Sequence, residues 1–252
     1  MKSRLSKSQR KQLRREGIYP YAQIQTNKSN FKLDDIEPIT DNQEKVFDAF
    51  DNNKNLLLHG LSGTGKTFMS MYLALEHLLD GMSDYKKLVI IRSVVPTRDM
   101  GFLPGSAKDK AKVYEMPYST ITSDLFGRGD AYQILKSKGI VEFETTSFLR
   151  GVTFEDSIVF VDEINNMTFH ELDSVITRVG QNCRIIFSGD FRQSDLKESR
   201  DKNGLLEFME VLKKLKDFEY IELTENDIVR SGLVKEYIIA KHQMGFGQMM
   251  VA

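Results

Sequence analysis

The sequence has a single cysteine, Cys183, and no hydrophobic run long enough to span a membrane. One cysteine excludes a disulfide framework and favours a reducing compartment. The basic start of the chain also lacks the apolar stretch that a signal peptide needs. We find no internal repeat and no second domain, and 252 residues suffice for one large domain. We therefore expect a single cytoplasmic domain.

The net charge of -1 is small, but the charges are unevenly distributed. Residues 1–15 carry seven basic side chains and no acidic one, which leaves 28 basic against 36 acidic side chains elsewhere. Residues 1–35 are polar with few apolar anchors, and we assign them to a basic N-terminal arm. Such an arm is either a solvated tail or a contact for the phosphates of a nucleic acid.

A glycine-rich segment follows the short apolar strand predicted at Asn55 to His59 and precedes the helix predicted at Phe68 to Leu75. This segment is Gly60-Leu61-Ser62-Gly63-Thr64-Gly65-Lys66-Thr67. A strand, a G-x-x-x-x-G-K-T loop and a helix in this order are typical of a phosphate-binding loop. Its backbone N–H groups point at phosphate oxygens, Lys66 can reach the outer phosphates, and the Thr67 hydroxyl can ligate magnesium. The pattern predicts that the chain binds a nucleotide and Mg2+.

Gln43 lies 17 residues before Gly60, in a short helix that Thr40 or Asp41 would cap. Its amide can donate and accept at once, and could therefore pair with the N6 amine and N7 of adenine. Such pairing would recognise an adenine base. The alternative is a surface glutamine in a capped helix.

Two predicted strands end in polar residues that suit the chemistry of nucleotide hydrolysis. The strand from Ser157 ends in Asp162 and Glu163, of which Asp162 would hold magnesium and Glu163 would orient and deprotonate a water. The strand from Cys183 to Ser188 leads into Gly189-Asp190-Phe191-Arg192-Gln193. Gln193 could sense the γ-phosphate and the attacking water.

The segment from Ser93 to about Thr122 is predicted to be a long irregular loop, because it contains three prolines. It also carries lysines interleaved with aromatic residues, a pattern that suits single-stranded nucleic acid. These residues are Lys108, Lys110, Lys112, Tyr114 and Tyr118. The alternative is a lysine-rich, solvated helix.

Several motifs occur together in the order found in a known family. They are Gly60 to Thr67, Gly101-Phe102-Leu103-Pro104-Gly105, Arg150-Gly151, Asp162-Glu163, Gly189 to Gln193, and Asp227-Ile228-Val229-Arg230. Over about residues 38 to 241 the chain resembles PhoH-like ATPases, of the short type common in bacteriophages. The resemblance implies one RecA-like α/β domain at 36–243, with a mostly parallel sheet flanked by helices, and a loose tail at 244–252. It also implies ATP and Mg2+, and action in the cytoplasm, which would be the host cytoplasm if the chain is phage-encoded. The family has a glutamine where this chain has Asn165, which predicts weaker coupling between nucleic acid and nucleotide.

We expect magnesium-dependent ATP hydrolysis coupled to single-stranded nucleic acid, RNA more than DNA, with a helicase-like motor core. Lys66, Glu163, Gln193 and Arg230 are the predicted catalytic residues. The alternatives are a nucleotide-controlled binding switch with slow hydrolysis and a phosphate-loop kinase, which Glu163 disfavours. Only 59 residues follow Gln193, too few for a second motor domain. Arg230 would then serve its own nucleotide or that of a neighbour, and we favour a homo-oligomeric ring, a hexamer by analogy.

Overall fold

The computed structural model describes residues 31–80, 83–93, 107–149, 151, 153–191 and 199–244. Some predicted features lie outside these ranges. They are most of the basic arm, the Gly101 to Gly105 turn, Arg150, Gln193 and the tail beyond Met244.

Six strands form one parallel sheet with the order β3-β2-β4-β5-β1-β6. The strands are β1 Asn55–Gly60, β2 Lys87–Arg92, β3 Val141–Thr145, β4 Ser157–Asp162, β5 Arg184–Gly189 and β6 Phe218–Leu223. The strands predicted at Asn55 to His59, from Ser157, and at Cys183 to Ser188 are confirmed as β1, β4 and β5, to within a residue at each end. Because they run in the same direction, their carboxyl ends lie along one edge of the sheet, where ligands bind in open α/β folds.

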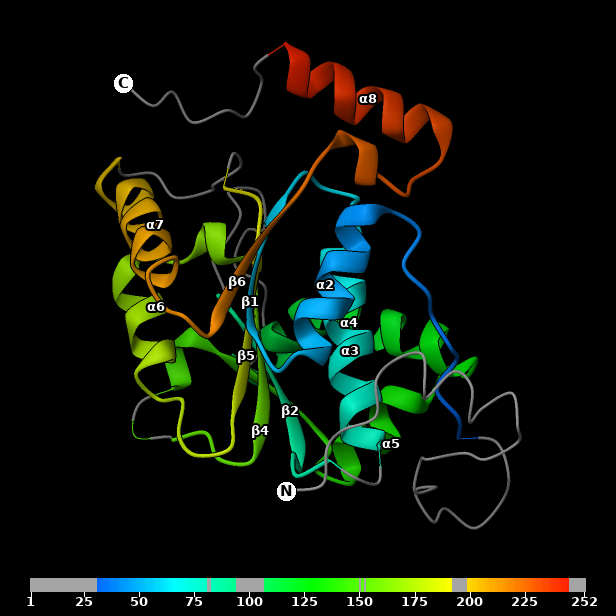
Figure 1. Ribbon diagram of the computed structural model, residues 1–252. Helices are drawn as coiled ribbons and strands as arrows, with labels where there is room; N and C mark the ends of the chain where they lie inside the picture. The colour runs from blue at the N-terminus through cyan, green and yellow to red at the C-terminus, as the bar shows by residue number, and fades with distance from the viewer. Residues whose placement is uncertain are drawn as a thin grey trace.

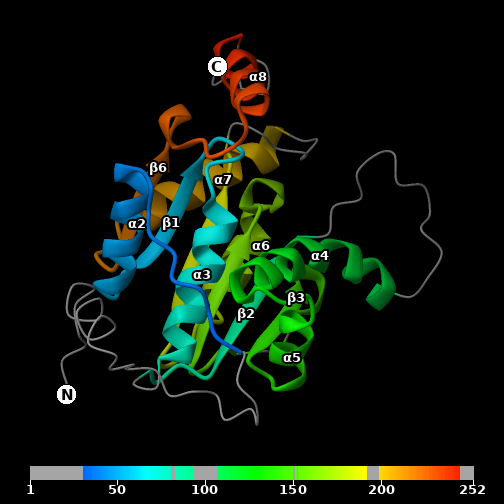
Figure 2. The same ribbon diagram turned by 90° about the vertical axis from the view of Figure 1, so that its right-hand side faces the viewer.

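Helices cover both faces of this sheet (Figure 1). On one face lie α2 Asp41–Asp51, α3 Lys66–Leu79, α4 Ala107–Phe126 and α5 Ala131–Ser137, and on the other α6 Phe169–Ile176 and α7 Ser199–Leu212 (Figure 2). The last helix, α8 Gly232–Gln243, lies above the carboxyl edge of the sheet. The predicted fold class, an α/β domain with helices around a parallel sheet, is confirmed. Within the described ranges no helix combines the length and apolarity needed to cross a membrane.

Two apolar cores sandwich the sheet, because successive residues of a strand face opposite sides. In β4, Ile158 and Phe160 belong to the core beneath α3 and α4, whereas Val159 and Val161 belong to the core beneath α6 and α7. All four side chains are fully buried. Burial on both faces explains why this strand is a continuous apolar run, as expected of a parallel sheet.

From Ala107 onward the prediction of an irregular loop is wrong and the alternative of a helix is confirmed, because α4 occupies Ala107–Phe126 with Pro117 inside it. Proline removes one backbone donor but does not end this helix. The buried side chains recur with helical spacing at Tyr118, Thr122 and Leu125, and this spacing outweighs the proline as a signal.

Candidate nucleotide site

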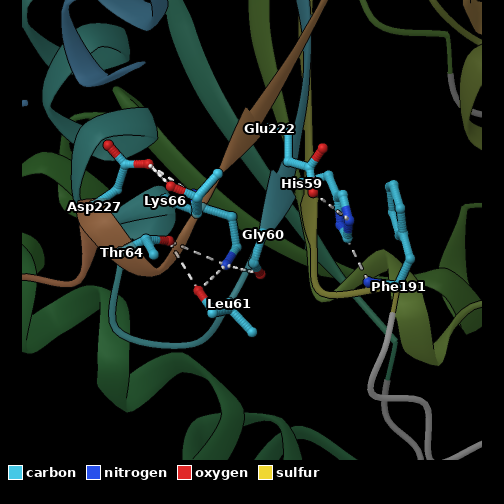
Figure 3. A network of polar contacts seen from close by, with 9 residues as sticks. His59, Gly60, Leu61, Thr64, Lys66, Phe191, Glu222 and Asp227 are labelled. Atoms are coloured by element: carbon cyan, nitrogen blue, oxygen red, sulfur yellow. Dashed lines mark hydrogen bonds and ion pairs between the residues drawn. The ribbon is translucent and has the colours of Figure 1, made fainter. Parts of the chain in front are cut away.

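The phosphate-binding loop joins the end of β1 to the start of α3. Gly63 and Gly65 have φ angles of 80° and 85°, a left-handed conformation that favours glycine. The Lys66 ammonium donates to the carbonyl oxygens of Gly60 and Leu61 at 2.8 and 2.9 Å (Figure 3). The N-terminus of α3 adds its dipole at the same place. The loop therefore has the backbone conformation and the cation expected of a phosphate site.

Three carboxylates at the ends of two neighbouring strands act electrostatically on the Lys66 ammonium. Burial lowers the pKa of Lys66, and the negative charges of Asp190, Glu163 and Asp162 oppose this shift. Asp190 comes from the end of β5, and the other two come from the end of β4. The convergence follows from the parallel sheet, which brings the predicted acids to the phosphate loop.

Oxygen donors suited to magnesium meet where α3 begins and β4 ends. The Thr67 hydroxyl lies 3.3 Å from both carboxylate oxygens of Asp162. Burial and the neighbouring charge of Glu163 raise the pKa of Asp162 to about 6, against the opposing effects of Arg92 and Tyr118. Magnesium prefers such oxygen ligands and usually keeps several waters with only one or two carboxylates. The donor set fits this ion. No cluster of three or more His, Cys, Asp or Glu side chains suited to a metal occurs in the described part of the chain.

Glu163 follows Asp162 in an unusual backbone conformation. Its φ of 54° lies in the left-handed region, which non-glycine residues seldom occupy. A short 3-10 turn, η2 Ile164–Asn166, follows directly. Strain of this kind gathers at functional sites, where the surrounding structure fixes the backbone. The half-buried Glu163 carboxylate is close enough to influence both Lys66 and Asp162 electrostatically.

Asn165, where the resemblance leads us to expect glutamine, has a structural contact through its side chain. Its amide oxygen accepts a hydrogen bond from the Asp190 backbone N–H at 3.1 Å. A Cβ on Gly189 would lie only 2.8 Å from this oxygen, so glycine allows the close approach. The shorter amide thus ties the turn after β4 to the end of β5.

Gln43 lies beneath the phosphate loop and is 4% exposed. Its amide oxygen accepts from the Ile39 N–H at 3.0 Å, and its amide nitrogen donates to the Thr64 carbonyl at 3.4 Å. Of the two predicted caps, Thr40 rather than Asp41 caps α2, by accepting from the Gln43 N–H. The alternative of a surface glutamine is wrong. Adenine recognition by this amide stays a prediction.

Arg230 lies against the phosphate loop of its own chain. The Val229 N–H donates to the Gly63 carbonyl at 3.0 Å, and a Cβ on Gly63 would come within 2.9 Å of the Arg230 Cγ. Ile238 of α8 approaches the same position at 3.4 Å. The sequence left open whether Arg230 serves its own nucleotide, and here it is placed beside its own loop.

Asp227 anchors the segment that carries Arg230, a role that sequence reasoning missed. It ends the 3-10 turn η3 Glu225–Asp227 and is 1% exposed. Its carboxylate accepts from the Thr40 hydroxyl, from Asn42 Nδ2 at 2.9 Å, and from the Thr224 N–H at 2.7 Å. These bonds join η3 to the start of α2. Asp227 belongs to a motif of the resemblance, but nothing in the sequence pairs it with residues 185 or more positions away.

His59 is a second missed residue, at the end of β1 and next to the phosphate loop. Its ring stacks on Phe191 with centroids 4.2 Å apart and planes at 4°. Its Nδ1 accepts from the Phe191 N–H at 3.4 Å, and its Nε2 lies 3.9 Å from Glu222 (Figure 3). Phe191 is two residues before Gln193, so His59 fixes the start of the segment leading to the predicted γ-phosphate sensor.

The aromatic residues proposed to stack on nucleic acid bases have different surroundings. Tyr118 is fully buried, and its hydroxyl donates to Asp162 at 3.0 Å, so its predicted stacking role is wrong. Tyr114 is half-buried, with its ring centroid 5.7 Å from the guanidinium carbon of Arg92. Lys112 is exposed. The predicted contacts of Lys112 and Tyr114 with nucleic acid stay predictions.

The fold and the site together define a P-loop NTPase. At the carboxyl edge of a parallel sheet, a glycine-rich loop that contains Lys66 and Thr67 lies next to β4, which ends in Asp162 and is followed by Glu163. Comparison with known proteins gives the family: the chain belongs to the PhoH-like proteins, whose family model matches residues 35–241.

Curated relatives match over most of the chain. A PhoH-like protein of Bacillus subtilis is 33% identical over 212 residues, which cover 84% of this chain and 65% of that protein. A PhoH-like protein of Mycobacterium tuberculosis is 31% identical over 206 residues, or 81% of this chain and 57% of that protein. The protein PhoH of Escherichia coli is 29% identical over 194 residues, covering 76% and 54%. The chain thus spans between half and two thirds of the length of these relatives.

Solved structures match more distantly. The large terminase of a thermophilic bacteriophage aligns with a TM-score of 0.48 and 13% identity, covering 80% of this chain and 50% of that one. The Pif1 helicase of Candida albicans aligns with a TM-score of 0.41 and 14% identity, covering 83% and 44%. At these scores the matches say nothing of the chain's activity.

Proposed function

We propose that the chain is a magnesium-dependent ATPase whose activity is coupled to single-stranded nucleic acid, RNA in preference to DNA. The observation that carries this proposal is the convergence of Lys66, Thr67, Asp162 and Glu163. The Thr67 hydroxyl lies 3.3 Å from the Asp162 carboxylate. The negative charges of Asp162 and Glu163 raise the pKa of Lys66, against the effect of its burial. A kinase has no need of Glu163 as a water-directing base.

Hydrolysis in this site is an in-line attack of water on the γ-phosphorus. Lys66 neutralises the outer phosphates, and Glu163 orients the water and accepts its proton. Gln193 senses the γ-phosphate, and Arg230 stabilises the charge that develops in the transition state. Magnesium, when bound through Thr67 and Asp162, supplies further charge neutralisation at the phosphates. Gln43 recognises adenine in this proposal, after exchanging its contact with Thr64 or Ile39 for the base.

The position of Arg230 favours action on its own nucleotide, since its side chain lies against Gly63 of the same loop. The homo-oligomeric ring, a hexamer by analogy, is the alternative in which Arg230 reaches a neighbour. Mixing inactive Arg230→Ala with inactive Glu163→Gln protein separates the two. A ring predicts partial recovery of activity, because some interfaces would join an intact Glu163 to an intact Arg230. Action in the same chain predicts no recovery at any mixing ratio.

The nucleic acid contact is proposed for α4 and for the basic arm at residues 1–15. In α4 the exposed Lys112, Val113 and Met116 lie within one helical turn and present a cation with apolar neighbours. Phosphates would meet the lysine and bases the apolar side chains. We place this activity in the cytoplasm, or in the host cytoplasm if the chain is phage-encoded.

A nucleotide-controlled binding switch with slow hydrolysis is the second candidate. It is favoured by Asn165, whose amide oxygen is bonded to the Asp190 N–H where the family has a longer glutamine. The test is steady-state phosphate release with no nucleic acid, with single-stranded RNA and with single-stranded DNA of equal length. Strong stimulation by RNA supports the coupled ATPase. Unstimulated, slow release together with ATP-dependent RNA affinity supports the switch. No phosphate release and no nucleotide binding would refute both.

A further inference from the structure

Helix α4 approaches the candidate metal site with two aromatic residues one turn apart. Tyr114 and Tyr118 both face Arg92 at the end of β2. Tyr118 lies deeper, with no exposed surface, and its hydroxyl donates to Asp162 Oδ2 at 3.0 Å. α4 therefore supplies a hydrogen bond to the carboxylate that faces Thr67.

Arg92 completes the surroundings of that carboxylate. It pairs in register with Asp162 on the adjacent strand, and its side chain lies against the Tyr118 hydroxyl. Burial alone would lower the pKa of Arg92, but Tyr118, Asp162 and Glu163 together hold it above its ordinary value. Since arginine only donates hydrogen bonds, the Tyr118 oxygen accepts from Arg92 and its O–H is directed to Asp162. The three side chains form one chain of polar contacts from β2 through α4 to β4.

Tyr132 provides a comparison, because its hydroxyl also donates to a carboxylate, but one that lies away from the nucleotide site. Tyr132 of α5 is also fully buried, and its hydroxyl donates to Glu115 of α4 at 2.7 Å. That bond joins two helices, and Lys136 pairs with the same carboxylate. Both tyrosines thus donate to a carboxylate from within the same apolar core. They differ in the acceptor, because only the acceptor of Tyr118 faces Thr67.

We propose that Tyr118 is a positioning residue for the magnesium site, because its hydroxyl fixes the orientation in which Asp162 meets the metal. This inference rests on the proposed binding of a magnesium nucleotide. A ligating carboxylate is usually held by partners of this kind, and their removal typically weakens metal affinity by about 10- to 100-fold. The position of α4 then sets the metal affinity of the nucleotide site through Asp162.

The test is Tyr118→Phe, which keeps the ring between Phe143 and Phe160 and removes only the hydroxyl. Mn2+ serves as the probe in place of Mg2+, and its dissociation constant is measured by electron paramagnetic resonance with ADP present. We expect about tenfold weaker Mn2+ binding in the variant. Affinity for ADP without metal should stay as in the unchanged protein, since Asp162 then has no metal to hold.

Tyr132→Phe is the matched control, because it also removes a buried hydroxyl that donates to a carboxylate. It should bind Mn2+ as the unchanged protein does, while thermal unfolding shows a comparable loss of stability in both variants. Unaltered Mn2+ binding by Tyr118→Phe would overturn the inference, and so would equal weakening in both variants. If the unchanged protein binds ADP with no contribution from Mn2+, the proposed function itself fails. That outcome is separate from any difference between the two variants.

Discussion

The anchor at Asp227 gives the sharpest prediction on stability. Its buried carboxylate accepts hydrogen bonds from Thr40, Asn42 and Thr224, and so holds η3 against α2. Asp227→Ala removes every one of these acceptors. Bonds to a charged group contribute about 1.5–3 kcal/mol each, but the donors at the surface of α2 can rebind water. We therefore expect a loss of about 2–4 kcal/mol in the free energy of unfolding, well below the sum of the separate bonds.

The pH dependence gives this prediction a sign. Burial alone would raise the pKa of Asp227, but hydrogen bonds from Asn42, Thr40 and Thr224 hold it below its ordinary value of 3.8. A carboxyl whose folded pKa is depressed stabilises the fold above its unfolded pKa, and this stability is lost as pH falls through the folded value. The unchanged protein should therefore exceed Asp227→Asn in free energy of unfolding by the full amount at neutral pH. This difference in free energy of unfolding should decrease only below about pH 4.

Urea unfolding of the unchanged protein, Asp227→Ala and Asp227→Asn at several pH values provides the assay. Asp48→Asn is the matched control, since Asp48 lies exposed on α2 and removal of its charge should change stability by less than about 0.5 kcal/mol. Nucleotide affinity should fall in the Asp227 variants, because the Val229 contact to Gly63 loses its support. An Asp227→Ala protein as stable as Asp48→Asn would refute the reasoning.

Three further predictions concern the loop, the sensor segment and the arm. Gly63→Ala should weaken ADP binding in a fluorescence titration, because alanine disfavours a φ of 80° and its Cβ would collide with Arg230; unchanged affinity would contradict this. His59→Leu loses the acceptor for the Phe191 N–H and the ring that stacks on Phe191, which together contribute about 1–3 kcal/mol. Turnover should therefore fall by roughly ten- to a hundredfold, while the affinity for ADP stays unchanged. Turnover in His59→Leu equal to that of the unchanged protein would show that His59 does not support the Gln193 segment. Deleting residues 1–15 should weaken RNA binding and flatten its salt dependence, with ATP binding retained. If the truncated and full-length proteins bind RNA with equal affinity across a salt series, the arm is a solvated tail.

The sheet and the centre of the site were predictable because both depend on local patterns. Each strand is marked by a compact apolar or alternating stretch, and parallel strands bring their carboxyl ends to one edge. Lys66, Thr67, Asp162 and Glu163 therefore come together as the sequence predicted. Their catalytic and metal-binding roles stay predictions. For α4 a loop was preferred to the alternative of a helix, because Pro117 was given more weight than the helical spacing around Tyr118.

The supporting contacts were not predictable, because each joins residues that no local pattern relates. Tyr118 and Asp162 lie 44 positions apart, and Thr40 and Asp227 lie 187 apart. Such pairs depend on how helices dock on the sheet. Arg230 illustrates the limit, since its motif marked it as important but only the fold placed it beside Gly63.

Turnover by Glu163→Gln tests the central claim most directly. This change keeps the shape of the side chain and removes the base. Phosphate release from ATP is measured with and without Mg2+, beside Glu219→Gln as a control at an exposed position of β6 and Lys66→Ala as a binding-defective reference. The account predicts ATP binding as tight as in the unchanged protein and turnover lower by about 10²-fold or more in Glu163→Gln. It predicts normal turnover in Glu219→Gln. Phosphate release by Glu163→Gln at the rate of the unchanged protein would contradict the account.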